Sequence, residues 1–273
     1  MTKVRLDLEM VSRGLCASRE KARALILAGE VRVNGARAEK AGQEIPNDAE
    51  IAVVEDAIPF VSRGGLKLDK AVKTFPIDLR GRTCADIGAS TGGFTDVMLK
   101  NGAKHVYAID VGYGQLDWTL RNDARVTVME RTNARFMTKE WFSEPIDFAS
   151  IDVSFISLRL ILPPLFESLE EEGEVVALIK PQFEAGRSEI GKNGVVRDAT
   201  VHERVIRDML SFADGVGFEV EDLSFSPITG PKGNIEFLLY IKKTSTKNDA
   251  CMHKVSGKVT EIVQNAHLIG KIC

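Results

Sequence analysis

Two ionisable side chains stand directly after apolar runs of the sequence. Asp152 follows residues 147–151, and Lys180 follows residues 175–179. Lysine is rarely buried without a partner, so an acid and a lysine at the tips of neighbouring buried strands are unusual for packing alone. A lysine whose pKa is lowered by desolvation or by a nearby cation can accept a proton from a hydroxyl group. The pair therefore predicts proton-transfer chemistry.

A second group of residues is typical of a nucleotide-type ligand site. An apolar run at 84–87 leads into three glycines, and a second run at 105–109 ends in Asp110. Glycines let the backbone approach a ligand, and the acid can hold ribose hydroxyls. Ser90 between the glycines, and an acid two residues before the first of them, look more like an S-adenosylmethionine (SAM) site than a dinucleotide site. A plain strand–helix turn is the structural alternative. The candidate cofactor ligands are Asp86, Gly88, Ser90, Gly92, Gly93, Asp110 and Asn133.

The order of the apolar runs predicts the fold that positions these residues. Runs with strand character alternate with helical patterns, which is typical of a parallel, doubly wound α/β sheet. Ligands of such sheets bind beyond the carboxyl ends of the strands, where the acids and the lysine named above fall. The segment Gly230-Pro-Lys-Gly233 predicts a turn between the last two strands. We expect seven strands, at 84–87, 105–109, 126–129, 147–151, 175–179, 218–225 and 235–241, and helices at 93–101, 115–121, 156–169 and 200–214.

The first 55 residues predict a separate small α+β domain. Ser18 can cap a helix that Gly29 ends, and it follows a helix at 5–14. Asn34-Gly35 is a strong hairpin signal, and a further strand is expected at 51–54. Residues 1–40 carry nine Lys or Arg against five acids, a local balance of +4. We place domains at 1–56 and 62–243, a linker at 57–61, and a tail at 244–273 whose apolar residues have helical spacing.

The bulk composition of the 273 residues is that of an ordinary globular chain with a net charge of −3. No apolar stretch approaches the ~18 residues of a membrane-spanning helix, and acids stand where a signal peptide would be apolar. We therefore expect a cytoplasmic protein with reduced cysteines. Cys251, His253, His267 and Cys273 lack the spacing of structural zinc sites, so no metal is expected.

The N-terminal segment resembles the alpha-L RNA-binding motif, named for the small-subunit ribosomal protein S-four. The resemblance covers residues 4–54 and rests on Ser12-Arg-Gly-Leu15, Ser18-Arg-Glu-Lys-Ala22 and Val31-Arg-Val-Asn-Gly35. A basic helix face beside a hairpin can clasp RNA through shape and phosphate contacts. The resemblance implies RNA-binding roles for Arg13, Arg19, Lys21, Arg23 and Asn34, whereas a solvated charged face is the structural alternative.

The rest of the chain resembles FtsJ-type (RrmJ-like) ribose 2′-O-methyltransferases. Ser62-Arg-Gly-Gly-Leu-Lys-Leu68 matches their first helix, and the resemblance implies a catalytic Lys-Asp-Lys-Glu tetrad. Fusion to the RNA-binding motif resembles the TlyA family, whose members act on ribosomal RNA. The sequence departs from the stand-alone enzymes at Asp152-Val-Ser-Phe155, where they have Asp-Met-Ala-Pro. The implied tetrad is Lys67, Asp152, Lys180 and Glu236, with Lys180 as the base, Lys67 and Asp152 tuning it, and Glu236 fixing Lys67 or the ribose.

Two other functions compete with this interpretation. The family is often labelled hemolysin, which suggests a membrane-active protein, and a vestigial fold would suggest a non-catalytic RNA-binding or ribosome-assembly factor. A long glycine-rich segment after Lys180 is interpreted either as a substrate-gripping loop or as a plain solvated loop. In the first case its candidate phosphate contacts are Arg187, Lys192 and Arg197. The oligomeric state is not indicated by the sequence.

Overall fold

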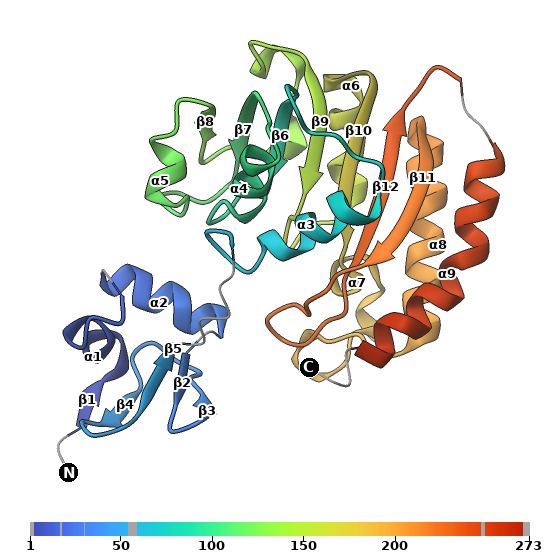
Figure 1. Cartoon of the computed structure of the whole chain (residues 1–273). Coiled ribbons are helices and arrows are strands. Elements are labelled where there is room, and N and C mark those ends of the chain that lie inside the picture. The colour runs from blue at the N-terminus through green and yellow to red at the C-terminus, as the bar shows by residue number, and fades with distance from the viewer. Residues whose placement is uncertain (1–2, 17, 30, 54–58, 247–248, 270–273) are drawn as a thin grey trace. The chain divides into compact units, whose positions relative to one another are not determined.

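The computed structural model divides the chain into two compact units, residues 1–59 and residues 60–273 (Figure 1). The structure describes residues 3–16, 18–29, 31–53, 59–246 and 249–269. The expected linker at 57–61 lies partly outside these ranges. Phe60 and Val61, at its end, pack against the hydrophobic core of the second unit. Each unit has its own core and is described by itself below.

The described residues of the first unit form two helices and two small sheets. Strand β1 pairs antiparallel with β4, and β2 pairs with both β3 and β5. The predicted caps are confirmed: the Ser18 hydroxyl accepts the amide hydrogen of Lys21, and Gly29 has φ 79°. Asn34 and Gly35, with φ 50° and 79°, form the predicted hairpin turn. The elements are β1 (Lys3–Arg5), α1 (Leu6–Ser12), α2 (Arg19–Ala28), β2 (Val31–Val33), β3 (Ala36–Arg37), β4 (Glu44–Pro46) and β5 (Ile51–Val53). Of these, β1 and β4 were not predicted.

The second unit is built on the predicted seven-stranded, doubly wound sheet. Its strand order is β11-β12-β10-β9-β6-β7-β8, and β12 runs antiparallel to both of its neighbours. Because β9 lies between β10 and β6, the residues that follow these three strands meet at one edge. The strands are β6 (Thr83–Ile87), β7 (His105–Ile109), β8 (Val126–Met129), β9 (Ile146–Ile151), β10 (Leu169–Ile179), β11 (Phe218–Phe225) and β12 (Phe237–Lys243).

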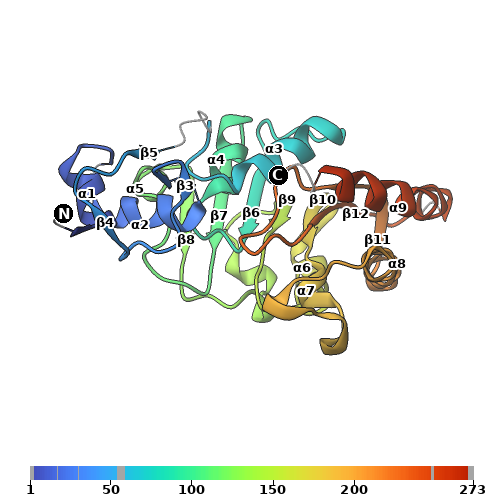
Figure 2. The same cartoon turned by 90° about the horizontal axis from the view of Figure 1, so that it is seen from below.

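Helices cover both faces of this sheet, which Figure 2 shows edge-on. On one face α3 and α4 pack on alternate strand residues such as Cys84 and Val176. On the other face α6 and α8 pack on the remaining strand residues, which alternate with the first set and include Ala85 and Val175. The helices are α3 (Gly65–Thr74), α4 (Gly93–Lys100), α5 (Trp118–Arg121), α6 (Leu162–Ser168), α7 (Pro181–Glu184), α8 (Ala199–Val216) and α9 (Asp249–Ile269). Short 3₁₀ turns occur at Ala134–Phe136, Lys139–Trp141, Leu158–Leu160, Arg187–Glu189 and Lys192–Gly194.

Two predicted helices differ from the observed ones. The segment expected as a helix at 156–169 forms a 3₁₀ turn and then α6, because Pro163 and Pro164 can begin a helix but not continue one. The helix expected at 115–121 is the single turn α5, which begins after the Asp117 cap. The tail forms α9, whose Val255, Val259 and Val263 are fully buried against the core.

A histidine pair joins α9 to α8. His202 of α8 is fully buried, and its Nδ1 lies 2.9 Å from Nε2 of His267 in α9. Burial, and then the neighbouring His267, lower the pKa of His202 from 6.5 to about 4. The native state therefore keeps His202 neutral at pH values where the unfolded chain would protonate it.

This depressed pKa predicts a loss of stability in acid. Between pH 6.5 and 4 His202 is protonated in the unfolded chain but neutral in the native state. Its contribution to the free energy of unfolding is therefore fully present above pH 6.5 and is lost as the pH falls. This group alone should cost about 2 kcal/mol of the free energy of unfolding between pH 7.5 and 5. Denaturant unfolding of wild type and His202→Asn at both pH values measures the effect. The wild type should lose about 2 kcal/mol more than the variant, and equal losses would contradict the assignment.

Candidate active site

Four charged side chains form a continuous chain at the carboxyl edge of the sheet. Glu236 Oε2 lies 2.7 Å from Lys67 Nζ, which donates a 3.1 Å hydrogen bond to Asp152 Oδ2. The other oxygen of Asp152, Oδ1, lies 2.6 Å from Lys180 Nζ. All four predicted tetrad residues therefore meet, in the order Glu236, Lys67, Asp152, Lys180.

Each member of this tetrad comes from a different element. Lys67 is in the first turn of α3, Asp152 directly follows β9, and Lys180 directly follows β10. Because β9 and β10 are parallel neighbours, their last residues are brought side by side. Glu236 lies one residue before β12 rather than inside it, and its carbonyl accepts the amide hydrogen of Ser226 at 2.8 Å. That bond ties it to the end of the adjacent strand β11.

The tetrad is buried, and its charges stabilise one another. The side chains of Lys67, Lys180 and Glu236 are at most 10% exposed. Burial alone would lower the pKa of Lys67, but the Asp152 and Glu236 carboxylates raise that pKa above its ordinary value. Burial alone would raise the pKa of Asp152, but the two lysines hold it below its ordinary value. Lys67 and Asp152 are therefore both charged near neutral pH.

The bridging position of Asp152 changes the expected relation between the two lysines. The sequence predicts that Lys67 acts on Lys180 as a neighbouring cation. In the structure each lysine has a different oxygen of Asp152 as its neighbour. The negative charge of Asp152 therefore lies next to both lysines and opposes the effect of the Lys67 cation on Lys180.

Asp86 joins α4 to the sheet through hydrogen bonds within the protein. It is fully buried, and its carboxylate accepts hydrogen bonds from the Thr95 amide, the Thr95 hydroxyl and the Ser150 hydroxyl. Burial raises the pKa of Asp86 to about 6, against the opposing effect of these bonds. Asp86 therefore has a structural role, and its predicted contact with a cofactor stays a prediction. Its carboxylate fixes the first turn of α4 to the sheet.

The three glycines of the loop are likewise required by contacts within the protein. Gly88 has φ 88°, and a Cβ there would lie 2.7 Å from the carbonyl oxygen of Asp152. A Cβ on Gly93 would lie 2.7 Å from the amide nitrogen of Gly65, at the start of α3. Gly92 has φ 94° and faces the side chains of Leu116 and Leu120. These close approaches give each glycine a packing role, and the approach of a ligand to their backbone stays a prediction.

Asp110 is the predicted cofactor residue whose surroundings best suit a ligand. Its carboxylate accepts amide hydrogen bonds from Ser90 at 2.8 Å and Gly112 at 2.6 Å, so it joins the loops after β6 and β7. Ser90 itself has φ 49°. A carboxylate has about four acceptor sites, so Asp110 can still accept from hydroxyl groups. Val111 beside it is 68% exposed, and Asn133 after β8 is exposed as well.

Two loops next to the tetrad carry residues that the sequence analysis did not single out. Lys180 donates a 3.1 Å hydrogen bond to the Ser154 hydroxyl. Phe155, which is 92% exposed and has φ 63°, lies with its ring centre 5.3 Å from that of Phe183. Glu184 accepts hydrogen bonds from Ser157 Oγ at 2.6 Å and from the Leu158 amide. The loops after β9 and β10 are thus joined along their length. The sequence signal for them was the departure at Asp152-Val-Ser-Phe155.

The predicted RNA-binding residues of the first unit separate into two groups. Arg19 and Arg23, together with Arg5, surround the fully buried Asp7, and the hydrogen bond from Arg5 helps to hold its pKa well below the usual range. Both predicted arginines remain about half exposed.

The other candidates make structural contacts or are simply exposed. Arg13 donates to the carbonyls of Ala49 and Asn47 and pairs with Glu9, so it clamps α1 to a loop. The Asn34 side chain accepts the Glu50 amide hydrogen at 2.9 Å, and Lys21 is exposed.

The glycine-rich segment after Lys180 is held over the sheet edge by a buried asparagine. Asn234 donates to the Gly194 carbonyl and accepts the Val196 amide hydrogen at 3.1 Å. Arg187 and Arg197 are exposed, whereas the side chain of Lys192 lies outside what the structure describes.

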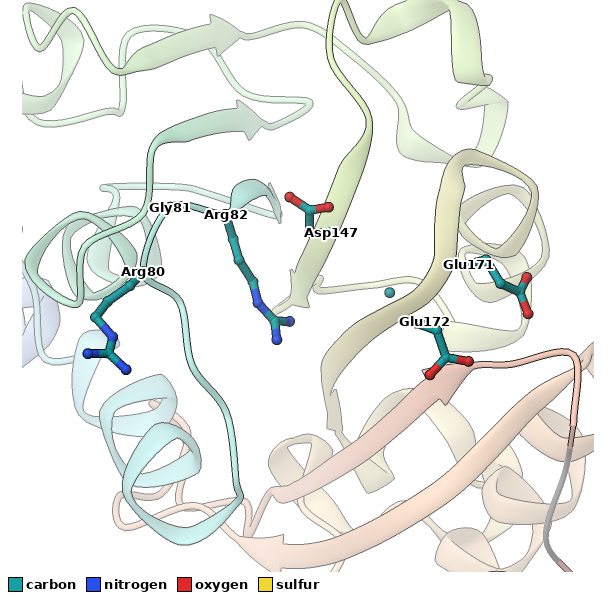
Figure 3. A pocket seen from close by; sticks show the side chains of 7 residues that line it. Arg80, Gly81, Arg82, Asp147, Glu171 and Glu172 are labelled. Atoms are coloured by element: carbon teal, nitrogen blue, oxygen red, sulfur yellow. The ribbon is translucent and has the colours of Figure 1, made fainter.

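A separate pocket lies at the amino edge of the sheet, and Figure 3 shows the side chains that line it. It is placed at the amino ends of β6, β9 and β10, so it is remote from the tetrad. Ion pairs of Arg82 with Glu174 and of Lys242 with Glu172 lie at this edge. The lining residues are Arg80, Gly81, Arg82, Asp147, Glu171, Glu172 and Gly173.

No helix within the described ranges is long and apolar enough to cross a membrane. Nor do three His, Cys, Asp or Glu side chains of the described residues gather in a way that could hold a metal ion. Cys273, part of the set weighed as a zinc site, lies outside the described residues.

A seven-stranded sheet of this order, with one antiparallel strand and a charged cluster at its carboxyl edge, defines the Rossmann-like methyltransferase class. The family of FtsJ-like methyltransferases matches residues 60–243, and the S4 domain matches residues 4–51.

Several relatives share both parts. "Putative rRNA methyltransferase YqxC" of Bacillus subtilis is 54% identical over 88% of this chain and 85% of its own length. "16S/23S rRNA (cytidine-2'-O)-methyltransferase TlyA" of Mycobacterium tuberculosis is 44% identical over 88% of this chain and 90% of its own. A solved structure, "Putative hemolysin from Streptococcus thermophilus", is 48% identical, covers 100% of this chain and 98% of its own, and has a TM-score of 0.79. The chain belongs to the TlyA family of FtsJ-like methyltransferases.

Proposed function

We propose that this protein transfers the methyl group of SAM to a ribose 2′-hydroxyl of ribosomal RNA. The observation that carries the proposal is the buried chain Glu236–Lys67–Asp152–Lys180, which ends in a lysine beside the loops of the candidate SAM site. The ribosomal substrate rests on the relatives, two of which are named for rRNA methylation. An RNA-modifying enzyme of this kind would act in the cytoplasm, where ribosomes are found.

The residues at the carboxyl ends of β6, β7 and β8 suit SAM. Asp110 offers acceptor oxygens for ribose hydroxyls, and the exposed Val111 next to it offers an apolar surface for an adenine ring. Ser90 shapes the loop through its amide bond to Asp110. Gly88 brings this loop against the backbone of Asp152, so the candidate SAM site adjoins the tetrad.

Bound SAM would supply an electrophilic methyl group on a sulfonium. The attacking ribose oxygen must lose its proton as the new oxygen–carbon bond forms, and in this proposal Lys180 accepts that proton at Nζ. Asp152 holds Lys180 in place, and Lys67 stays protonated as a fixed cation because two carboxylates surround it. Glu236 then serves to fix Lys67. Alignment of hydroxyl, methyl and sulfonium supplies much of the remaining rate.

Exposed aromatic and basic groups could receive the RNA. Phe155 and Phe183 stand next to Lys180 and offer a surface on which a nucleobase could stack. On the first unit, Arg19 and Arg23 converge on one side of α2 and can contact phosphates. We infer that the S4 unit contributes affinity and that the methyltransferase unit contributes chemistry.

The hemolysin names among the relatives suggest a competing, membrane-active function. The tetrad favours methyl transfer, because a buried lysine held by a carboxylate is an arrangement that suits proton abstraction and that membrane lysis does not need. It also favours a catalytic protein over a passive RNA-binding factor. The proposal is tested by incubating purified protein with ribosomal subunits and SAM labelled in its methyl group. Label in the rRNA supports methyl transfer, and an unlabelled rRNA fraction with both subunits contradicts it.

Removal of the Asp110 carboxylate should weaken SAM binding about 10- to 100-fold. The reason is the loss of charge-assisted hydrogen bonds to ribose hydroxyls, worth roughly 1.5–3 kcal/mol. Titration calorimetry of wild type and Asp110→Ala with SAM measures the change. Asp123→Ala is the matched control, because Asp123 is an acid paired with Arg125 at the amino end of β8. Unchanged SAM affinity in Asp110→Ala, or a preference of the wild type for NAD, would refute the site.

A further inference from the structure

The amino group of Lys180 has two oxygen neighbours, and both come from the loop after β9. Asp152 Oδ1 lies at 2.6 Å and the Ser154 hydroxyl at 3.1 Å. Lys180 is 7% exposed, whereas Ser154 is exposed at the mouth of the tetrad. Ser154 is therefore the more exposed of these two contacts of Lys180.

Two fixed acceptors restrict the orientation of the Lys180 amino group. A protonated amine has three N–H donors and no acceptor. The neutral amine that can act as a base has two N–H donors and one lone pair. When both donors are directed at fixed acceptors, the tetrahedral geometry of nitrogen leaves one direction for the lone pair. With Asp152 as the single acceptor, the amino group could rotate about its C–N bond and the lone pair would have no fixed direction.

Other contacts keep the two acceptors fixed relative to the lysine. Glu184, four residues after Lys180, accepts hydrogen bonds from Ser157 Oγ and the Leu158 amide. Phe183 contacts Phe155 between these two points. The loop that carries Asp152 and Ser154 is thus fastened to the segment that carries Lys180.

We propose that Ser154 is a positioning residue that directs the lone pair of neutral Lys180 toward the ribose hydroxyl. The inference rests on the proposed function, because it assigns the geometry of the proposed base. The Ser154 hydroxyl accepts one N–H of Lys180, and Asp152 Oδ1, which lies 2.6 Å from Nζ, offers an acceptor for the other. The remaining tetrahedral position of Nζ receives the 2′-hydroxyl proton as the methyl group is transferred.

The test compares three variants of the full chain by methyl transfer to ribosomal subunits. Ser154→Ala removes the acceptor and should lower kcat about 5- to 30-fold, while KM for the subunits and for SAM stays within twofold. Ser154→Thr keeps the hydroxyl and should retain kcat within about threefold. Ser211→Ala is the matched control, because it removes an exposed hydroxyl of α8, which contributes no residue to the tetrad or to its loops. It should therefore stay within twofold of wild type.

The outcomes separate this inference from the function on which it rests. An active wild type with unchanged kcat in Ser154→Ala overturns the role of Ser154 and leaves the methyltransferase function standing. Equal losses in the alanine and threonine variants, or an equal loss in Ser211→Ala, also overturn it, because the hydroxyl at 154 would not be the cause. A rise in KM without a fall in kcat would place Ser154 in substrate binding instead. A wild type that transfers no methyl group overturns the function and this inference together. Thermal unfolding of each variant confirms that it is folded.

Discussion

Replacement of Lys180 by alanine should lower methyl transfer by about 10²–10⁴-fold, the usual contribution of general base catalysis. The expected cause is that neither Lys67 nor Asp152 can take the proton in its place. Lys67 is held protonated between Asp152 and Glu236. Asp152 is kept ionised with a lowered pKa and is therefore a weak base. Transfer of labelled methyl to ribosomal subunits measures the loss, and SAM binding by calorimetry should be unchanged.

The arginine variant separates the role of a base from that of a positive charge. Lys180→Arg keeps a cation beside Asp152, but a guanidinium does not lose its proton in proteins and cannot accept one. We expect it to be nearly as inactive as the alanine variant. Full activity in Lys180→Arg would show that the site needs only a charge, and the assignment of Lys180 as the base would then be abandoned.

Loss of two arginines on α2 should weaken RNA binding about 10- to 100-fold at 0.1 M salt. Each phosphate contact contributes roughly one unit to the slope of log affinity against log salt, so Arg19→Ala/Arg23→Ala should lower that slope by about two units. Binding of ribosomal RNA at several salt concentrations measures it. The fold should persist, because Arg5 still pairs with the buried Asp7 through two hydrogen bonds.

A matched control tests whether position or total charge causes the effect. Lys104 and Lys139 are exposed cations, each paired with a carboxylate as the arginines are, and they lie on the methyltransferase unit away from the carboxyl edge. Lys104→Ala/Lys139→Ala changes the net charge equally and should leave the salt slope within half a unit of wild type. Equal slopes for the two double variants would contradict an RNA-binding role for α2.

The strand ends of the site could be predicted because parallel strands obey a simple rule. If the apolar runs at 147–151 and 175–179 form parallel strands, Asp152 and Lys180 must lie at the same edge of the sheet. Lys67 and Glu236 could be assigned only by resemblance, since no local pattern shows that α3 reaches the end of β9. Helical spacing also predicted that Arg19 and Arg23 lie on one face of a helix. Their shared partner Asp7 could not be predicted, because it lies in another helix.

The loop after β6 shows why other contacts of the site could not be predicted. A sequence shows that Asp86 and Gly93 are present, but not which neighbour uses them. The Asp86 carboxylate accepts hydrogen bonds from Thr95 and Ser150. Gly93 allows the start of α3 to pack closely against it. Ser154 could not be predicted for a different reason. It lies in an irregular loop without periodicity, and its contact with Lys180 depends on how two loops meet.

The position of the transferred methyl group tests the central claim most directly. Ribosomal subunits are incubated with the wild-type protein and methyl-labelled SAM, and their rRNA is digested to nucleosides that are separated and identified by mass. The account predicts label in a 2′-O-methylated nucleoside, and no such product with Lys180→Ala. Label on a base, or equal 2′-O-methylation by wild type and Lys180→Ala, would contradict it.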